Sequence, residues 1–187
     1  MKVYSKILTI VLLIVVIAFT VYNVKAQGKI YKIGQRGPAG GWIFYDKGSY
    51  ADGWRYLEAA PEDQSESAEW GLYAYSFPGA KGTAIGTGKI ITQTIVSISA
   101  EAGIAARLCT AYRAGGKSDW FLPSKDELNL MYTNLKKNGV GGFSASAYWS
   151  STEYNEYYAW NQYFDFGEQI GKNHKYDKIR VRAVRSF

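Results

Sequence analysis

Few residues in this sequence are suited to covalent or metal chemistry. The 187-residue chain contains one cysteine, Cys109, and one histidine, His174. A lone cysteine excludes an intrachain disulfide, a multi-cysteine zinc site and a copper site built on paired thiolates. A Ser-His-Asp triad would have to use His174, and nothing in the sequence places a serine beside that residue. We therefore predict neither a metal nor a cofactor.

Three carboxylates near the C-terminal aromatic residues form the strongest catalytic candidate. Glu153, Glu156 and Asp165 could cleave a glycosidic bond, because two carboxyl groups about 5 to 9 Å apart suffice for that reaction. The sequence supplies no apolar pocket that would raise the pKa of one acid, so we favour acids that solvate an exposed sheet. Calcium could lie among Glu153, Asn155, Asp165 and Asp177, but no loop has regular ligand spacing.

Aromatic residues crowd the same region and make binding the better supported function. Nine of the 19 residues from 148 to 166 are aromatic, which favours strands. Alternation along the run predicts an inner face of Trp160, Gln162, Phe164 and Phe166 and an outer face of Asn161, Tyr163 and Asp165. Exposed tyrosines give a large contact area at low entropic cost, so we predict Tyr157, Tyr158 and Tyr163 to contact a ligand.

The first 26 residues differ in kind from the rest of the chain. Lys2 and Lys6 precede an apolar run over residues 7–21, and small residues at 24–26 suggest a cleavage site. The run is shorter than the roughly 20 residues that span a membrane, which favours a signal peptide over an N-terminal anchor at residues 7–22. We expect export to the periplasm or cell surface, and contact with a membrane only through this segment if it is retained.

The remaining residues, 27–187, have the composition of one folded domain, since the whole chain is 47% hydrophobic and 20% charged. Short strands are expected at 40–45 and 54–60, joined by an Asp52-Gly53 turn, and a long loop is expected over 61–91. Further strands are expected within 148–166 and at 179–184. The pattern predicts an α+β fold with two main helices and short, mostly antiparallel strands.

The two helices have different signatures. Apolar residues recur every three or four positions from 92 to 112, which predicts one helix, interrupted near Gly103, with Cys109 buried on the face of Ala102, Ala105 and Tyr112. The second helix follows the string Ser124-Lys125-Asp126-Glu127, which is a capping box.

Positive charge gathers at the C-terminus. Residues 167–187 contain six bases, Lys172, Lys175, Lys178, Arg180, Arg182 and Arg185, against two acids, Glu168 and Asp177. We predict Lys172, Lys175 and Lys178 to contact an anionic carbohydrate or envelope surface, and Arg182 and Arg185 to be paired inside the domain. Export makes nucleic acid a poor candidate ligand.

Five strings in order resemble the Lcl C-terminal domain, the terminal domain of the Legionella collagen-like adhesins and of many exported bacterial proteins. They are APEDQS at 60–65, GTAIGTG at 82–88, SDWFLPSKDEL at 118–128, YWSSTEY at 148–154 and VRAVR at 181–185. The resemblance covers almost all of the chain after residue 40. The collagen-like repeats of those adhesins are missing here, which argues against multivalent adhesion.

This resemblance implies a C-type-lectin-like fold, similar to that of formylglycine-generating enzymes and of the variable proteins of diversity-generating retroelements. Formylglycine chemistry needs a cysteine pair that this chain lacks. In the variable proteins, the segment that corresponds to 149–182 displays the binding surface. The display positions that this implies are Tyr154, Asn155, Tyr157, Tyr158, Asn161, Tyr163, Asp165, Asn173, His174 and Tyr176. The adhesin example binds sulfated polysaccharide.

The sequence therefore predicts an exported, non-enzymatic module that binds carbohydrate or protein through a C-terminal aromatic and basic surface. Three alternatives stay open: an envelope enzyme that cleaves glycans with Glu153 and Asp165, a receptor diversified by a retroelement, and a purely structural surface domain that binds no ligand.

Overall fold

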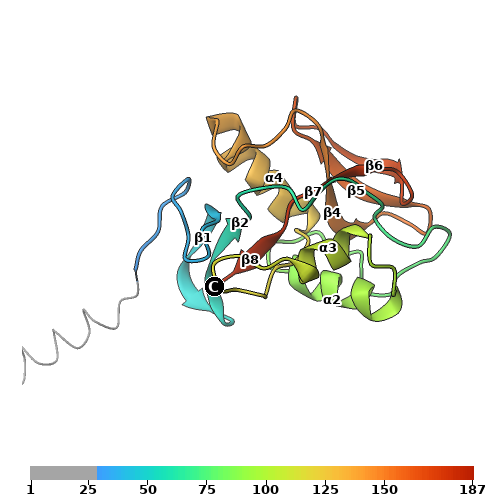
Figure 1. Ribbon diagram of the computed structural model, residues 1–187, viewed down its shortest axis with the longest axis horizontal. Coiled ribbons are helices and arrows are strands. Elements are labelled where there is room, and N and C mark those ends of the chain that lie inside the picture. The colour runs from blue at the N-terminus through green and yellow to red at the C-terminus, as the bar shows by residue number, and fades with distance from the viewer. Residues whose placement is uncertain (1–28) are drawn as a thin grey trace, which may run out of the picture. The chain divides into compact units, whose positions relative to one another are not determined.

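The computed structural model describes residues 29–187 (Figure 1). The predicted signal peptide or anchor, including the apolar run at 7–22, lies outside the described residues. Residues 31–187 form one compact unit. No helix among residues 29–187 is long and apolar enough to cross a membrane.

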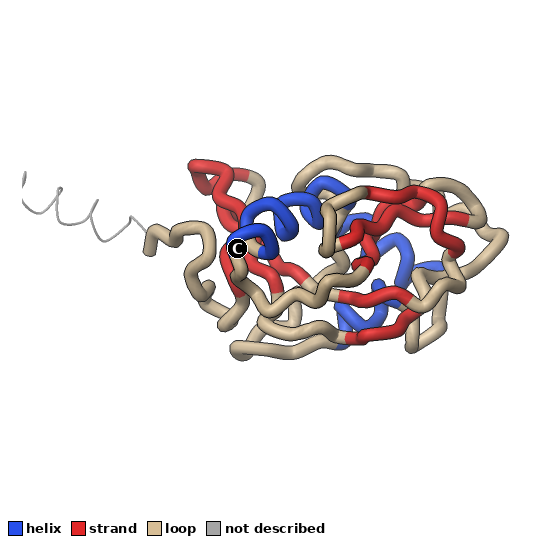
Figure 2. Tube along the Cα trace, turned by 90° about the horizontal axis from the view of Figure 1, so that it is seen from above, coloured by secondary structure: helices blue, strands red, loops and turns tan. Residues whose placement is uncertain are grey.

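Strands and helices are both present, so the α+β prediction is confirmed. The strands are β1 Trp42–Ala51, β2 Trp54–Ala59, β3 Ser65–Ala68, β4 Ala147–Glu153, β5 Tyr158–Tyr163, β6 Gln169–His174, β7 Ile179–Val181 and β8 Val184–Ser186. The helices are α2 Gly88–Ile98, α3 Ala105–Ala111 and α4 Lys125–Asn134, followed by a 3₁₀ turn at Lys136–Asn138. Long loops join many of these elements (Figure 2).

The strands form two sheets of unequal size. One sheet has the order β1-β2-β8, and the other has the order β3-β7-β4-β5-β6. Neighbouring strands are antiparallel except β4 and β7, which are parallel. The predicted hairpin of β1 and β2 is confirmed, and its turn residues Asp52 and Gly53 have φ values of 53° and 83°, as a tight hairpin turn requires. β3 falls inside the segment predicted to be a loop.

The helix predicted over 92–112 is two helices, α2 and α3, and the break between them contains Gly103, where the interruption was predicted. α2 ends at Ile98, where the Arg107 guanidinium donates to the carbonyl oxygens of Val96 and Ser99, at 2.7 Å each. These bonds satisfy two carbonyls that a continuing helix would have used. Cys109 on α3 is fully buried, as predicted, and burial raises the pKa of its thiol, but Ala102 is exposed in the connection.

The capping box at the start of α4 is confirmed. Ser124 accepts a hydrogen bond from the Glu127 amide, and the Glu127 carboxylate accepts one from the Ser124 amide at 2.7 Å. The same carboxylate also accepts from the Gly86 amide at 2.8 Å, just before α2. Burial raises the Glu127 pKa to about 7, although the hydrogen bonds from Ser124 and Gly86 oppose the shift. One buried acid thus joins the starts of two helices.

The hydrophobic core forms two clusters, one around Trp70 and Trp149 and one around Phe44 and Phe164. The predicted burial of Trp149 and Phe164 is confirmed. Phe166 was predicted to face inward, and this is wrong: it is 60% exposed because β5 ends at Tyr163 and Phe166 lies in the following turn.

Candidate ligand-binding surface

Five aromatic rings from three segments lie together on the surface: Tyr73, Tyr157, Tyr158, His174 and Tyr176, called here the ring cluster. Tyr73 is its hub, with ring centroids 5.4 Å from Tyr157, 5.8 Å from His174 and 4.9 Å from Tyr176. His174 stacks on Tyr176 at 4.8 Å and an interplanar angle of 8°. Tyr73, Tyr157 and Tyr176 are 46%, 39% and 47% exposed. Large aromatic rings exposed side by side are typical of a contact surface.

Strand pairing explains how four of these rings meet. Tyr158 on β5 lies directly opposite His174 on β6, with ring centroids 4.6 Å apart. Tyr157 precedes β5 and Tyr176 follows β6, so all four rings lie at the same end of the β5–β6 strand pair. The aromatic density and the family resemblance pointed to these four positions, and the structure brings them together.

Tyr73 was not predicted as a contact residue, because it lies in the Gly- and Ser-rich loop before α2. The local cue is the string Tyr73-Ala74-Tyr75. Ala74 has a φ of 58°, in the left-handed region that residues with a side chain rarely adopt, and both neighbouring tyrosines are exposed. Burial and the neighbouring tyrosines raise the pKa of the Tyr73 hydroxyl, which therefore stays protonated near neutral pH. Backbone strain of this kind is often retained at functional sites.

A buried ion pair fixes the loop that carries Tyr73. The Lys175 ammonium and a Glu153 carboxylate oxygen are 2.6 Å apart, and neither side chain is exposed. Lys175 also donates to the Tyr75 carbonyl at 2.6 Å, and Glu153 accepts from the Phe77 amide at 2.9 Å. The pair therefore holds both sides of the 75–77 segment against the sheet. Burial lowers the Lys175 pKa, and the hydrogen bond to Glu153 opposes that shift.

Lys175 and Glu153 are both buried, which differs from what the sequence predicted. Lys175 was predicted to contact an anionic ligand, but it is buried between the rings of Trp70 and Phe77, 4.9 and 5.0 Å from their centroids. Glu153 was predicted to solvate an exposed sheet, but it is 2% exposed and neutralised by Lys175. The reason is that the loop before α2 covers the end of β4, which local sequence could not reveal.

Most of the positive charge at the C-terminus is paired rather than free. Lys178 contacts Glu69 at 2.8 Å, Arg180 contacts Asp63 at 2.9 Å, and Arg182 contacts Asp63 at 2.6 Å. Arg185 contacts Glu58 and Asp119, at 2.8 Å each, so the predicted internal pairing of Arg182 and Arg185 is confirmed. Of the six bases in 167–187, Lys172 alone has no ion pair with a described residue.

Asn161 was predicted to face outward, and this is wrong. It is 1% exposed, and its side-chain amide donates to the Ile170 carbonyl and to Asn173, at 3.1 and 2.9 Å. Asn161 is paired with Trp149 on the neighbouring strand β4, so its side chain lies on the same, buried face of the sheet as Trp149. Asn155 is also engaged, since its side-chain oxygen accepts from the amides of Tyr157 and Tyr158 at 2.9 Å each.

The other predicted residues lie in two grooves beside the ring cluster. A groove of about 390 Å³ contains Tyr163, Asp165, Asn173 and Lys178. It is lined by acids as well as bases, including Glu66, Asp177 and Arg180. The second groove, of about 370 Å³, contains Tyr154 and Lys172 next to Trp160. Trp160 was predicted to be core, but it is only partly buried, with the Lys125 ammonium 4.3 Å from its ring centroid.

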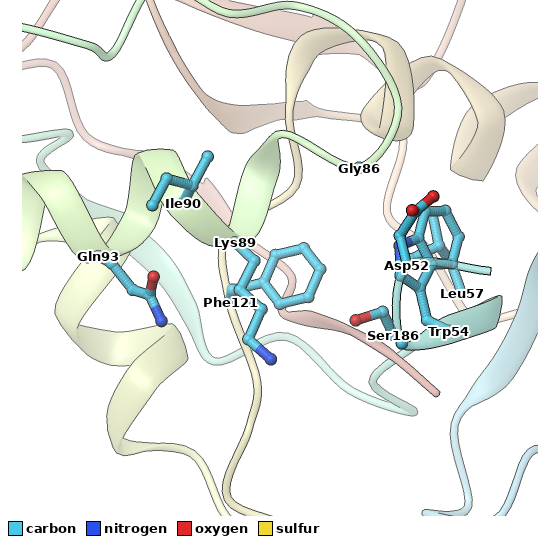
Figure 3. A pocket seen from close by; sticks show the side chains of 10 residues that line it. Asp52, Trp54, Leu57, Gly86, Lys89, Ile90, Gln93, Phe121 and Ser186 are labelled. Atoms are coloured by element: carbon cyan, nitrogen blue, oxygen red, sulfur yellow. The ribbon is translucent and has the colours of Figure 1, made fainter.

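A further hollow of about 360 Å³ contains none of the predicted residues (Figure 3). Trp54 and Leu57 of β2 and Phe121 form apolar parts of its lining, and Lys89 and Ile90 come from α2. Its rim carries both signs of charge, from Asp52 and Lys89. The described residues contain no group of three or more His, Cys, Asp or Glu side chains placed to hold a metal ion.

Comparison with protein families gives one match. The model of the Lcl C-terminal domain matches residues 62–185, about two thirds of the chain, and this range includes every member of the ring cluster. No curated protein is significantly similar to the chain.

Proposed function

Because the chain belongs to the Lcl C-terminal domain family, a family of adhesin-like domains, we propose that it is an exported, non-enzymatic module that binds a ligand through the ring cluster. The observation that carries the proposal is the exposed group of four tyrosines and one histidine, held by a buried ion pair. We propose carbohydrate as the ligand, because a row of rings offers flat faces on which sugar rings stack, with a protein surface as the alternative.

A C-type-lectin-like fold is part of this proposal. The mixture of short, mostly antiparallel strands with three helices is compatible with it, and family membership supports it. In such a fold the ring cluster would belong to the displayed segment 149–182, joined by Tyr73 from the loop before α2.

The charges around the ring cluster indicate which kind of ligand it would bind. Of the three lysines predicted to contact an anion, Lys175 is buried and Lys178 is paired to Glu69, and Lys172 lies in the groove with Tyr154 and Trp160 rather than among the rings. Stacking should therefore contribute more to affinity than attraction of an anion. Binding is expected to depend only weakly on salt, because screening acts mainly on exposed charges.

A glycan-cleaving enzyme is less well supported. Glu153 has its charge satisfied by Lys175 and the Phe77 amide, and it is closed off from solvent. Asp165 is exposed and lines a different groove. A pair of catalytic carboxyl groups has to face one substrate from both sides, and these two carboxylates do not share an open cavity.

A receptor diversified by a retroelement remains the second alternative. It would place changeable residues at the display positions, of which Tyr157, Tyr158, His174 and Tyr176 are in the ring cluster. A reverse transcriptase gene next to this one, with a near-copy of the sequence for 149–185, would identify that system.

The proposal is tested by a glycan array, with hydrolysis of each bound glycan measured in parallel. Tyr73→Ala and Tyr176→Ala should each weaken the strongest binding by about 1 to 3 kcal/mol, as contact aromatics do. Tyr50→Ala is the matched control, since Tyr50 is 71% exposed on β1, away from the ring cluster.

Loss of binding in both cluster variants, with normal binding in the control, supports the ring cluster. Equal binding by all three variants would place the ligand elsewhere, and product release from a glycan would replace the proposal with the enzyme.

A further inference from the structure

β6 is the edge of the five-stranded sheet, and we propose that a second copy of the chain pairs with it to form a two-fold symmetric dimer. Only β5 pairs with β6 among the described residues (Figure 1). An open edge can bind another strand through its unpaired backbone groups. Three features of residues 168–172 favour an identical strand as that partner.

The first feature is the direction of the backbone groups. The Glu168 carbonyl accepts from the Tyr163 amide, and Ile170 lies opposite Asn161 in the β5–β6 register. Because hydrogen-bonding groups alternate between the two sides of an antiparallel strand, Gln169 directs its own away from β5, and the extra residue of β6 between Ile170 and Asn173 interrupts this alternation. Two antiparallel copies centred on Ile170 would place Gln169 of each copy opposite Gly171 of the other, so that the outward backbone groups of Gln169 face the second copy.

The second feature is charge. Glu168 and Lys172 flank Ile170 at equal distances along the chain, and both are exposed. Neither forms an ion pair with any of residues 29–187. In a two-fold pair centred on Ile170, each Glu168 meets the Lys172 of the other copy. The strand is therefore complementary to itself, as a symmetric interface requires.

The third feature is the surface beside this edge. Gly171 has no side chain, and a Cβ atom there would lie 2.7 Å from Tyr154 and 3.2 Å from Trp160. The groove of about 370 Å³ along 168–172 also exposes Tyr154, which is 45% accessible. One extra residue of β6 at this point relative to β5 limits the pairing to a short stretch.

Such a dimer would give the protein two ring clusters. This consequence rests on the proposed function, whereas the dimer itself does not. Two linked sites bind a repeating ligand more tightly than one, without any new contact to the ligand. Pairing through β6 would thus make the proposed ligand binding multivalent.

Sedimentation velocity of the full chain, in wild-type and variant forms, tests the proposal. Glu168→Lys and Lys172→Glu each place like charges opposite one another, so each should weaken the dimer about tenfold or more. The two variants mixed in equal amounts should form a heterodimer, because one copy then carries lysine at both facing positions and the other copy carries glutamate at both. The double variant with both changes should dimerise like the wild type. Lys137→Glu, the same charge change in the Lys136–Asn138 turn, is the matched control and should leave the dimer intact.

Three outcomes would overturn the proposal. The first is a wild-type chain that stays monomeric at high protein concentration. The second is single variants that dimerise as well as the wild type, which would place self-association elsewhere. The third is single variants that dissociate but do not recover on mixing. Glycan binding by a monomeric single variant would leave the proposed function standing even when the dimer is lost.

Discussion

Two regions of the molecule use buried bases from the same C-terminal segment, and they use them differently. Arg182 binds Asp63 and the carbonyl oxygens of Ala60 and Gly141, so it joins three separate segments. Lys175 and Glu153 form a single pair whose other hydrogen bonds go to one loop. The arginine stabilises the fold as a whole, whereas the lysine fixes the position of a surface loop. A buried charge thus stabilises the fold in one region and positions a surface loop, the one proposed to contact the ligand, in the other.

Removing Arg182 should have the largest effect on stability. Arg182→Ala leaves Asp63 without its closest cation and two buried carbonyls without a donor, so the free energy of unfolding should fall by about 3 to 5 kcal/mol. Urea unfolding measures this loss. Lys178→Ala removes an exposed pair with Glu69 and should change the free energy by less than about 1 kcal/mol. Similar losses in both variants would contradict the distinction between buried and exposed pairs.

Breaking the pair beneath the ring cluster should affect both stability and binding. Lys175→Met leaves the Glu153 carboxylate buried without a cation, and we expect a loss of about 3 kcal/mol in the free energy of unfolding. The double variant Lys175→Met with Glu153→Leu should regain most of that loss, because an apolar pair of similar volume often replaces a buried ion pair without cost.

Binding should not recover in the double variant, because the Tyr75 carbonyl and the Phe77 amide lose their partners and the loop with Tyr73 is released. Chemical denaturation and the glycan assay of the same samples separate the two effects. Full recovery of binding together with stability would show that the pair does not position the loop.

The elements that could be predicted from the sequence are those fixed by neighbouring residues. The hairpin turn at Asp52-Gly53 and the capping box at Ser124 depend on a few adjacent positions, and both were found. The buried face of Cys109 followed from local periodicity in the same way. Four members of the ring cluster were predicted as contact residues from the aromatic density and the family resemblance.

The interpretations that failed depend on contacts between distant segments. Lys175 and Asn161 look exposed in a polar sequence, yet a loop about 100 residues away covers Lys175, and pairing with β4 places Asn161 on the buried face of Trp149. Tyr73 is 84 residues from Tyr157 along the chain, so no local pattern connects them. Periodicity over 92–112 indicated the interruption near Gly103, but it could not show that the Arg107 side chain satisfies carbonyl oxygens at the end of α2.

Glu127 differs from both buried bases, because its buried carboxylate accepts hydrogen bonds from the Ser124 and Gly86 amides and has no ion pair with a described residue. Burial raises its pKa from 4.5 to about 7, so the folded protein holds this proton more tightly than the unfolded chain does. The contribution of this group to stability is therefore fully present below about pH 4.5 and is lost as the pH rises towards 7. The loss should be on the order of 3 kcal/mol, at 1.36 kcal/mol for each pKa unit.

Other groups also titrate in this range, so the difference between two proteins is the useful quantity. Urea unfolding at pH 5 and pH 7.5 should show a steeper decline for the wild type than for Glu127→Gln, which carries no charge at either pH. Identical pH profiles would mean that the amide donors of Ser124 and Gly86 keep Glu127 ionised throughout.

The smallest expected effect concerns the strained residue beside Tyr73. Ala74 has a φ of 58°, which glycine adopts without the steric cost that a Cβ atom brings. Ala74→Gly removes that cost in the folded state but gives the unfolded chain more freedom, so the net gain in stability should be about 1 kcal/mol or less. If the strain serves to orient Tyr73 and Tyr75, the same variant should bind its glycan more weakly despite its higher melting temperature. A gain in stability with unchanged affinity would show that the Lys175–Glu153 pair alone positions the loop.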